Sequence, residues 1–415
     1  MSMNQQESQN TVEPAAIQPS RRRGVIIATT SVLAVGALVA GAWGAGAWSD
    51  AAPVEKEETA KNSVIQEHLD GLVDLGFPAA LASFTNPDGE HEDYVAGVGN
   101  LTTDEPVPVD GEVRMGSNTK TFTSVAVLQL VEDGQLALDE PIDTYLPGVV
   151  TGDGVDGTRI TVRHLLQQMS GLPEYADEIA MDFEKVQSVY TSPRDLLDIA
   201  LSKPAGFAAG ERWEYSNTNY LVLGLLIERV AERPLFEAIT ERIIEPLGLE
   251  HTYFPTVGEK TLRGEHPSGY HINSDGDFYD VSALDPSWGW AAGQIVASPS
   301  DLNEFTRAVL DGRLLGEEMT TEMQKTVPAE EGLWPGAGYG LGLQSYPLSC
   351  GGVIWGHGGD IHGFQTRNGV ASDGTAFTVA VTALPWAFIA EEDEPRMMDT
   401  YRAVTDAVDA AFCED

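Results

Sequence analysis

Apolar side chains recur every three to four residues along several stretches of the chain, and this spacing predicts amphipathic helices. The stretch 63–76 has this pattern and ends at a glycine, a residue that commonly terminates a helix. The stretch 119–133 ends in the same way, at Gly134. Further helices are expected over residues 162–169, 195–201, 220–231, 235–244, 299–310 and 396–412.

Runs rich in β-branched and aromatic residues predict strands near both ends of the chain. These strands are expected over residues 79–84, 93–98, 353–357, 364–371 and 375–382. Strands at both ends with helices between them predict an α+β fold. We expect its α/β core to come from about residues 63–145 and 285–415, and about residues 146–284 to form a mostly helical insert.

The first 47 residues have the pattern of an export signal. Three consecutive arginines at 21–23 precede a weakly apolar stretch, 24–47, which resembles a twin-arginine signal and ends in the small-x-small pattern of a cleavage site. About 24 residues can also span a bilayer, so an uncleaved signal anchor is the alternative. We expect an exported protein in the extracellular or cell-wall space, tethered to the membrane by 24–47 if the signal stays. Residues 48–62 would form an acidic tether.

The composition excludes some partners. The 415 residues include 64 Asp and Glu against 24 Lys and Arg, a formal net charge of −40. A nucleic-acid surface needs clustered basic residues, so no nucleic-acid partner is expected. Nothing in the sequence suggests a metal or an organic cofactor, and we expect a monomer.

Cys350 and Cys413 are the only cysteines. Two are too few for a disulfide scaffold or a zinc site. Because an exported protein meets an oxidising compartment, we expect the two to form a disulfide. The alternative is a pair of free, buried thiols.

The first candidate for chemistry is Ser117-Asn118-Thr119-Lys120, at a predicted helix start. Residues three apart share one face of a helix, so the hydroxyl and the amine would lie side by side. A serine becomes a nucleophile when a neighbouring base takes its proton, and a lysine held neutral can do so. Alone the pattern is weak, because an N-capping serine with a solvated lysine would look the same.

Two further elements add to this candidate. Tyr215-Ser216-Asn217 offers a phenol that can relay a proton and an amide that can bind a substrate amide. His357-Gly358-Gly359-Asp360 follows an apolar strand, where glycines permit a ligand to approach the backbone closely. Each has a plain structural alternative, namely a buried tyrosine beside a helix cap and a structural histidine.

Together the three elements resemble the serine β-lactamase and penicillin-recognising family. The match covers about residues 63–413 and is closest to its class C-like group, in particular to the secreted D-alanyl-D-alanine carboxypeptidases of the Streptomyces type. The stretches that carry it include VRMGSNTKTFTSVAVLQLVEDGQLALDEPIDTYLP, TVRHLLQQMSGLPEY, WEYSNTNYLVLGLLIERV, SWGWAAGQIVASPSDL, YGLGL and LSCGGVIWGHGGDIHGF. The resemblance implies a β-lactamase/transpeptidase-like fold: an antiparallel sheet flanked by helices, with a mostly helical inserted domain.

The resemblance also implies a mechanism. Ser117 would attack a substrate carbonyl and form an acyl-enzyme, while Lys120 and Tyr215 share the proton transfer. The backbone N–H groups of Ser117 and Asp360 would form an oxyanion hole. Which of Lys120 and Tyr215 is the acylation base stays open.

The remaining roles concern substrate binding. Asn217 would hold the substrate amide, and His357 would take the catalytic position of a family lysine. Gly358 and Gly359 would line the binding edge, and Trp288 aligns with a tryptophan that walls the pocket in the carboxypeptidases. A core aromatic is the alternative for Trp288. A bonded Cys350–Cys413 pair would also match this subgroup.

Three departures concern the substrate. The carboxypeptidases have His-Thr-Gly where this chain has Gly358 in the middle, and a small neutral residue where it has Asp360. They also have an arginine near Gln344, to hold the substrate carboxylate. Without it, a free D-Ala C-terminus would be bound poorly or by a residue from elsewhere, such as Arg367. We expect an exported D-alanyl-D-alanine carboxypeptidase that takes small peptides or esters and is acylated by β-lactams. The alternatives are an esterase, a D-amino-acid amidase or aminopeptidase, or a class C-like β-lactamase.

Overall fold

The computed structural model describes residues 54–180, 187–273, 276–329, 334–390 and 392–414, all of which belong to one compact unit. The predicted export signal, 1–47, lies outside the described residues. Among those residues, no helix has the length and apolar character that crossing a membrane requires.

The first helix corrects one prediction. Helix α1 (Val54–Leu75) begins inside the segment expected to be an acidic tether, 48–62. Its first residues, VEKEETAK, are mostly good helix formers. Lys61 then donates from Nζ to the backbone oxygens of Ala411 (3.2 Å) and Glu414 (2.5 Å), so α1 is fixed to the C-terminal end of the chain. The helix predicted over 63–76 therefore begins earlier, at Val54, inside the segment expected to be a tether.

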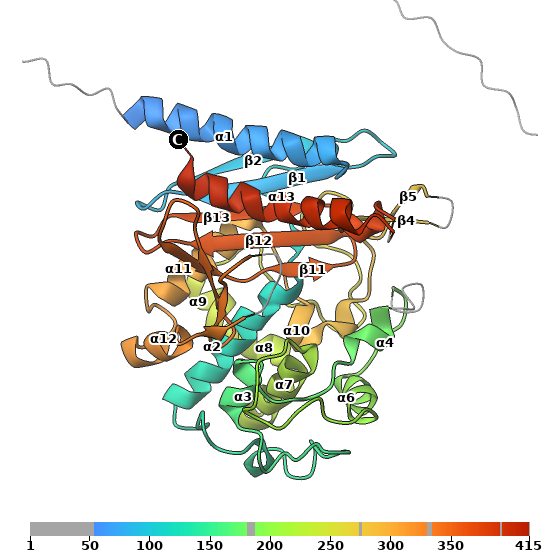
Figure 1. The fold of residues 1–415 in the computed structure, drawn as a ribbon, viewed down its shortest axis with the longest axis vertical. Coiled ribbons are helices and arrows are strands. Elements are labelled where there is room, and N and C mark those ends of the chain that lie inside the picture. Colours follow the sequence, from blue (N-terminus) through green and yellow to red (C-terminus); the bar gives the residue numbers. More distant parts are fainter. Residues whose placement is uncertain (1–53, 181–186, 274–275, 330–333, 391, 415) are drawn as a thin grey trace, which may run out of the picture. The chain divides into compact units, whose positions relative to one another are not determined.

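One antiparallel sheet forms the centre of the molecule (Figure 1). Its order is β2-β1-β13-β12-β10-β9-β8-β7, with β11 paired to β12. The two ends of the chain meet in β1 (Ala79–Thr85) and β13 (Ala376–Val381), which pair over six residues from Ala80–Val381 to Thr85–Ala376. The other strands are β2 (His91–Gly97), β7 (Val327–Pro328), β8 (Gly338–Tyr339), β9 (Gln344–Pro347), β10 (Val353–Gly356), β11 (Gly359–Ile361) and β12 (Phe364–Val370).

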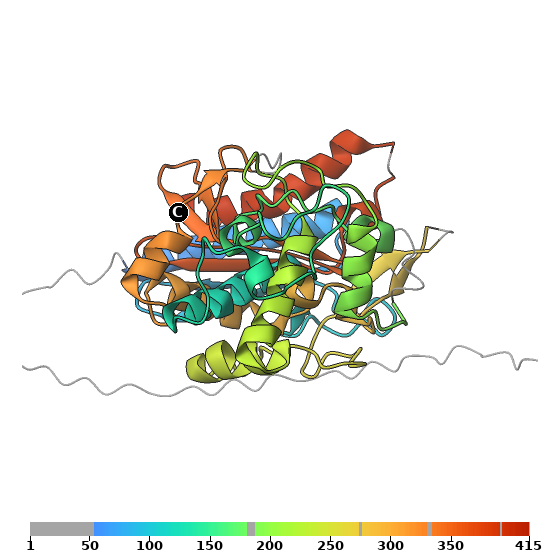
Figure 2. The same ribbon diagram turned by 90° about the horizontal axis from the view of Figure 1, so that it is seen from below.

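Helices cover both faces of the sheet. Helices α1 and α13 (Glu394–Cys413) lie side by side on one face, and α11 (Pro299–Leu310) packs on the other (Figures 1 and 2). Strand β1 alternates accordingly: Ala80 and Ala82 join the core under α1 and α13, whereas Ala79 and Leu81 join the larger core on the opposite face. The α+β fold predicted from the sequence is confirmed.

The larger core extends from the sheet into a helical part. Helix α2 (Thr119–Glu132) joins the two, because Phe122 stacks on Phe305 of α11 with ring centroids 3.5 Å apart. The helical part contains the helices α3 (Val162–Leu166), α4 (Ala176–Ala180), α6 (Pro193–Leu201), α7 (Asn217–Ala231), α8 (Leu235–Ile239) and α9 (Glu245–Leu247). It also contains a short hairpin, formed by β4 (Tyr270–Ile272) and β5 (Phe278–Asp280).

Two predicted helices are shorter or less regular than expected. Helix α3 ends at Leu166 rather than near 169, because Gln168 turns the chain at a φ of +61°. The helix predicted over 235–244 passes through a π-helical segment, Thr240–Ile244. Pro246 follows it and has no N–H to donate, which disturbs the regular hydrogen-bond ladder at that point.

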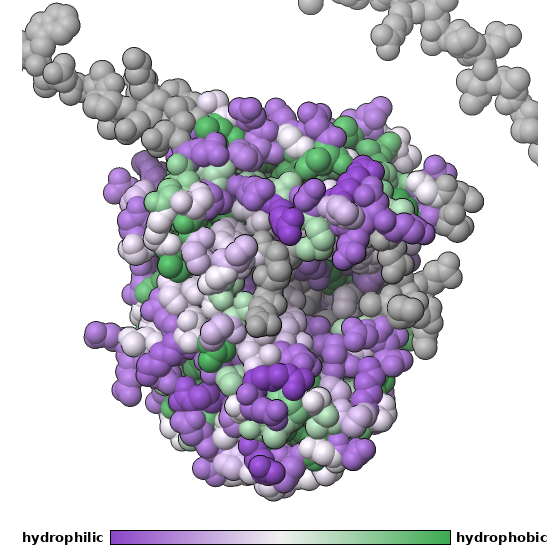
Figure 3. Space-filling model, in the orientation of Figure 1, coloured by the Kyte–Doolittle hydropathy of each residue, from purple (hydrophilic) through white to green (hydrophobic). Residues whose placement is uncertain are grey.

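The structure joins Cys350 to Cys413, with Cα atoms 5.5 Å apart. The bond ties the turn between β9 and β10 to the end of α13. Hydrophilic residues predominate on the face shown in Figure 3, in keeping with the excess of acidic residues.

Candidate active site

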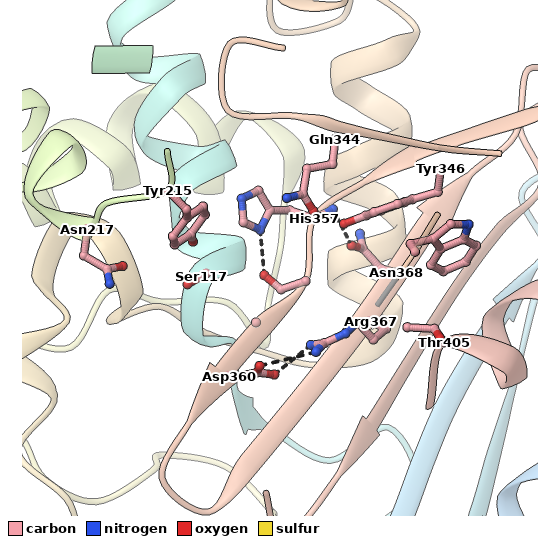
Figure 4. Close-up of a pocket in the computed structure, with 13 residues that line it drawn as sticks. Ser117, Tyr215, Asn217, Gln344, Tyr346, His357, Asp360, Arg367, Asn368 and Thr405 are labelled. Atoms are coloured by element: carbon pink, nitrogen blue, oxygen red, sulfur yellow. Dashed lines mark hydrogen bonds and ion pairs between the residues drawn. The ribbon is translucent and has the colours of Figure 1, made fainter. Parts of the chain in front are cut away.

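A cavity of about 370 Å³ lies where the start of α2 and the loop before α7 meet the edge formed by β10 and β11 (Figure 4). It brings together most of the residues that the sequence singled out. Its lining consists of Ser117, Tyr215, Asn217, Trp334, Gln344, Tyr346, His357, Gly358, Gly359, Asp360, Arg367, Asn368 and Thr405.

Ser117 and Lys120 stand side by side, as the three-residue spacing predicts. A 3-10 turn, Gly116–Asn118, leads directly into α2. Lys120 is fully buried, and its Nζ lies 3.0 Å from Ser117 Oγ. The same Nζ donates to Asn217 Oδ1 at 2.7 Å and to the backbone oxygen of Ala292 at 2.9 Å.

These contacts suit Lys120 to accept a proton. The Asn217 and Ala292 oxygens can only accept hydrogen bonds. In its neutral form Lys120 would give its two N–H groups to these oxygens and turn its lone pair toward Ser117 Oγ. The arrangement can activate the serine.

Tyr215 and Asn217 come from the loop before α7 and from its first turn. The Tyr215 ring lies beside Lys120, with Nζ 4.8 Å from the ring centroid. Ser216 caps α7 by accepting the Thr218 N–H, and the Glu174 carboxylate accepts the Asn217 N–H. Because its Oδ1 accepts from Lys120, Asn217 has its amide nitrogen to offer to a substrate carbonyl.

The backbones of the 3-10 turn and β11 approach each other closely. Gly116 has a φ of +49°, and a Cβ at this residue would lie 2.9 Å from the backbone nitrogen of Asp360. A Cβ at Gly359 would lie 2.0 Å from the Met115 oxygen. The side chain of Asn118 donates to Thr366 Oγ1 at 2.7 Å and joins the turn to β12. This packing brings the turn that carries Ser117 against the backbone of Asp360. The oxyanion hole formed by the Ser117 and Asp360 N–H groups stays a prediction.

His357 is a buried, neutral imidazole. Its Nδ1 donates to the Gly358 oxygen at 2.6 Å, so the hydroxyl of Tyr339, 3.2 Å away, donates to Nε2. Burial, and next the positive charge of Lys120, lower the His357 pKa from 6.5 to about 3. His357 can therefore orient groups in the cavity, but it cannot supply a positive charge near neutral pH.

Gly358, Asp360 and Arg367 form one unit. The Arg367 guanidinium binds the Asp360 carboxylate with two contacts, Nη1–Oδ1 at 2.7 Å and Nη2–Oδ2 at 3.3 Å (Figure 4). Nη1 also donates to the Thr366 oxygen at 2.7 Å. Burial disfavours the Arg367 cation, but Asp360 more than offsets this, so the Arg367 pKa lies above its usual value. A Cβ at position 358 would lie 3.1 Å from Nη1, so glycine makes room for the guanidinium.

The comparison with known families agrees with this geometry. The family model described as Beta-lactamase matches residues 62–402, most of the chain. The chain belongs to the beta-lactamase family. It is a serine-type hydrolase, and the family resemblance drawn from the sequence is confirmed.

Individual members of the family are also similar to this chain. A D-stereospecific amidohydrolase from a Streptomyces species is 34% identical, with a TM-score of 0.74, and the match covers 85% of this chain and 99% of that one. The D-amino acid amidase of Ochrobactrum anthropi SV3 is 25% identical, with a TM-score of 0.74 and coverage of 85% and 98%. Protein flp of Staphylococcus aureus strain MW2 is 27% identical over 201 residues, 48% of this chain and only 38% of that protein.

Trp288 is not among the described residues that line the cavity. Its ring lies edge-on to His362, with centroids 5.8 Å apart, and its backbone oxygen accepts the Tyr175 hydroxyl at 2.6 Å. Trp288 is partly buried against the larger core, and its role as a wall of the pocket stays a prediction.

Sequence reasoning missed Tyr339 and Asn368 and gave Arg367 no fixed role. Tyr339 lies in the YGLGL stretch, but only the fold brings its hydroxyl to His357. Asn368 accepts the His357 N–H on its side-chain oxygen at 2.9 Å, beyond the point where β10 and β12 pair. A hydrophobic pattern contains no signal for either contact.

Gln344, which stands near the expected arginine, accepts a hydrogen bond from the Tyr346 hydroxyl. In the described part of the chain, no three His, Cys, Asp or Glu side chains gather in a way that could hold a metal ion.

Proposed function

We propose that this serine hydrolase cleaves amides of D-amino acids through an acyl-enzyme on Ser117. One observation carries the proposal: the cavity exposes an anion and buries the matching cation. The Asp360 side chain is 41% exposed, whereas that of Arg367 is 9% exposed.

This exposure disfavours a substrate that ends in a carboxylate. Among the described residues that line the cavity, Arg367 is the one that carries a permanent positive charge. It already binds Asp360 and the Thr366 oxygen. A D-Ala-D-Ala carboxylate would have to compete with Asp360 for Arg367 while lying beside that anion. An uncharged carboxamide has no such cost.

The two similar solved structures support the same substrate class. One is named a D-stereospecific amidohydrolase and the other a D-amino acid amidase, and each is covered almost completely by this chain. Their names supply the D configuration in the proposal. The exposed Asp360 supplies the preference for an uncharged leaving group.

The reaction would proceed in two steps. Ser117 Oγ attacks the amide carbon while Lys120 and Tyr215 take its proton, and the new oxyanion accepts from the N–H groups of Ser117 and Asp360. The C–N bond then breaks, and Tyr215 returns the proton so that ammonia leaves. In the second step water attacks the ester carbon, its proton passes to the same pair, and the C–O bond to Ser117 breaks. The products are the free D-amino acid and the original serine.

The test is ammonia release from D- and L-phenylalanine amide by the full chain and its Ser117→Ala variant. We expect release from the D-amide, at least about ten times slower release from the L-amide, and none with Ser117→Ala. Serine-dependent D-alanine release from an acyl-D-Ala-D-Ala peptide, without release from either amide, would contradict the proposal.

A D-alanyl-D-alanine carboxypeptidase is the second candidate. The Cys350–Cys413 disulfide favours it, because the resemblance to that subgroup implies the same bond. In this case Arg367 would have to leave Asp360 and bind the peptide carboxylate. The peptide assay above distinguishes the two candidates. Acylation of Ser117 by a β-lactam is expected for both, so it does not discriminate between them.

We also propose that the protein is exported. Disulfides persist mainly in oxidising compartments, so the Cys350–Cys413 bond supports the export signal expected in residues 1–47. Fractionation of cells that produce the full chain tests this, and recovery of the chain in the cytoplasm would contradict it. The monomeric state expected from the sequence stays a prediction.

A further inference from the structure

We propose that the Asp360 carboxylate binds the positively charged α-amino group of the substrate. The enzyme would thus select D-amino acid derivatives whose amino group is free and protonated, and reject those in which it is acylated or replaced. This inference rests on the proposed function, since it names the part of a D-amino acid amide that the cavity recognises.

Position alone brings Asp360 near the α-amino group. Ser117 and Asp360 both line the cavity, and a Cβ at Gly116 would lie 2.9 Å from the Asp360 backbone nitrogen, so the proposed oxyanion of the attacked carbonyl lies near Asp360. The side-chain carboxylate belongs to the same residue, so it also lies near that oxyanion. The α-nitrogen of an amino acid amide is two bonds from the carbonyl carbon. A carboxylate on Asp360 can therefore reach the α-ammonium group of a substrate seated at Ser117.

The carboxylate keeps acceptor capacity after it has bound Arg367. A carboxylate has about four lone-pair sites on its two oxygens, and the two Arg367 contacts use one on each oxygen. The 41% exposure of the Asp360 side chain makes the remaining sites available from solvent. An ammonium group can use these sites while Arg367 holds the carboxylate in place, because hydrogen bonds between charged groups are the stronger ones.

Gly358 and Arg367 act as positioning residues for Asp360. Without a side chain, Gly358 leaves the space that Arg367 Nη1 occupies. Arg367 then approaches Asp360 diagonally across β11 and β12, where Asp360 pairs with Gln365 in the ladder. The chain departs from the carboxypeptidases at Gly358, at Asp360 and in lacking an arginine near Gln344, and these three departures have one explanation. A glycine, a buried cation and an exposed anion stand where the carboxypeptidases bind a substrate carboxylate.

Other charged or titratable groups near Asp360 do not take over its role. Lys120 is committed to Ser117, Asn217 and Ala292, and it is not an anion in either protonation state. Burial and the Asp360 charge raise the pKa of Tyr401 on α13, so that hydroxyl stays neutral. His357, which lines the same cavity, is neutral as well. Among the described residues that line the cavity, Asp360 is the one with the negative charge that an ammonium requires.

The experiment compares two substrates of nearly equal size. D-Phenylalanine amide carries the ammonium group, and D-phenyllactamide carries a hydroxyl in its place. We expect wild-type full chain to prefer the ammonium substrate by about 10- to 30-fold in kcat/KM. Asp360→Asn should reduce that preference to about 3-fold or less. The control is Asp104→Asn, which removes one negative charge from an exposed turn and should keep the wild-type preference.

A second measurement needs no variant. The wild-type preference should fall as pH rises through the pKa of the substrate amine, about 8, because D-phenyllactamide reports the titration of the enzyme's own groups. A preference that stays constant above that pH would overturn the inference, as would an Asp360→Asn enzyme with the wild-type preference. Equal serine-dependent turnover of both substrates by the wild type would overturn this inference but leave the proposed function standing. Absence of serine-dependent turnover of either substrate would overturn the proposed function together with it.

Discussion

The cavity has two walls of different character. We call Ser117, Lys120, Tyr215 and Asn217 the helix wall, because they come from the start of α2 and the entry to α7. We call His357, Gly358, Gly359, Asp360 and Arg367 the strand wall, because they come from the edge of the sheet between β10 and β12. The helix wall places a nucleophile, a base and an amide as the family pattern implies. The strand wall departs from that pattern at Gly358 and Asp360.

This difference suggests that one wall catalyses the reaction and the other selects the substrate. In the proposed reaction the helix wall contains the groups that make and break bonds, and Lys120 Nζ contacts two of its members directly. The strand wall would face the rest of the substrate, and its charges are arranged as an exposed anion over a buried cation. Changes to the helix wall should therefore affect the rate with every substrate. Changes to the strand wall should mainly affect which substrate is used.

The largest effect is expected at the nucleophile. Ser117→Ala removes the atom that forms the acyl-enzyme, so turnover of every substrate should fall by about 10⁴-fold or more. Mass spectrometry after incubation with a penicillin should show a covalent adduct on the wild type and none on the variant. Ser202→Ala, at an exposed helix end, is the matched control and should still form the adduct. An adduct on Ser117→Ala would break the assignment of the helix wall.

Lys120→Met should have the next largest effect. Methionine keeps an unbranched side chain of similar length in a fully buried site, but it cannot take the Ser117 proton. Loss of general-base catalysis should lower kcat/KM by about 10²- to 10⁴-fold, equally for substrates with and without an α-ammonium group. The control is Lys325→Met, at a side chain that is 64% exposed. A change in substrate preference larger than the change in rate would show that the two walls do not divide the work in this way.

Gly358→Thr tests the strand wall. The new Cβ would lie 3.1 Å from Arg367 Nη1, so the guanidinium must move and Asp360 loses its fixed partner. We expect a loss of about 1–3 kcal/mol in the free energy of unfolding, measured in urea, from this overpacking. The preference for an α-ammonium substrate should fall several-fold, with a smaller change in the acylation rate by a simple ester.

Gly71→Ala is the control for Gly358→Thr, since a Cβ added there meets no atom within 4 Å. It should leave the substrate preference unchanged and raise the free energy of unfolding by at most about 1 kcal/mol, because alanine favours a helix more than glycine does. If Gly358→Thr left both stability and preference unchanged, Gly358 would not be the residue that makes room for Arg367.

The same contrast explains what the sequence could predict. The Ser117–Lys120 pair is a local pattern, since residues three apart on a helix must share a face, and the structure has them 3.0 Å apart. The strands and the long helices were predicted for a similar reason, because their periods are local. The strands β7, β8 and β11 have two or three residues each, too few to show a period.

The strand wall depends on contacts that no local pattern contains. Arg367 reaches Asp360 because β11 and β12 pair in one particular register, with Asp360 opposite Gln365. The sequence showed an aspartate without a nearby cation and suggested Arg367 only as one option. The ion pair requires the strand register, the space at Gly358 and the burial of Arg367 together, and these follow only from the assembled fold.

The smallest expected effect is on the pH dependence of stability, through His357. Lys120 of the helix wall acts on the pKa of this strand-wall residue. The folded chain binds its proton only near pH 3, whereas the unfolded chain binds it near 6.5. The unfolded state therefore holds more protons in this interval, so stability from His357 is present above 6.5 and is lost as pH falls. Well inside the interval, His357→Gln should reduce the slope of unfolding free energy against pH by about 1.4 kcal/mol per unit.

Urea unfolding of wild type and His357→Gln at several pH values between about 6 and 4 measures this slope. The carboxylates that titrate in the same range are common to both proteins, so their contribution cancels in the difference. Lys120 is the second cause of the low His357 pKa, after burial. In Lys120→Met the His357 pKa should rise, and its contribution to the slope should end at a higher pH. If the slope of Lys120→Met matched that of the wild type down to the lowest pH, the charge of the helix wall would not reach the strand wall, and burial alone would keep His357 neutral.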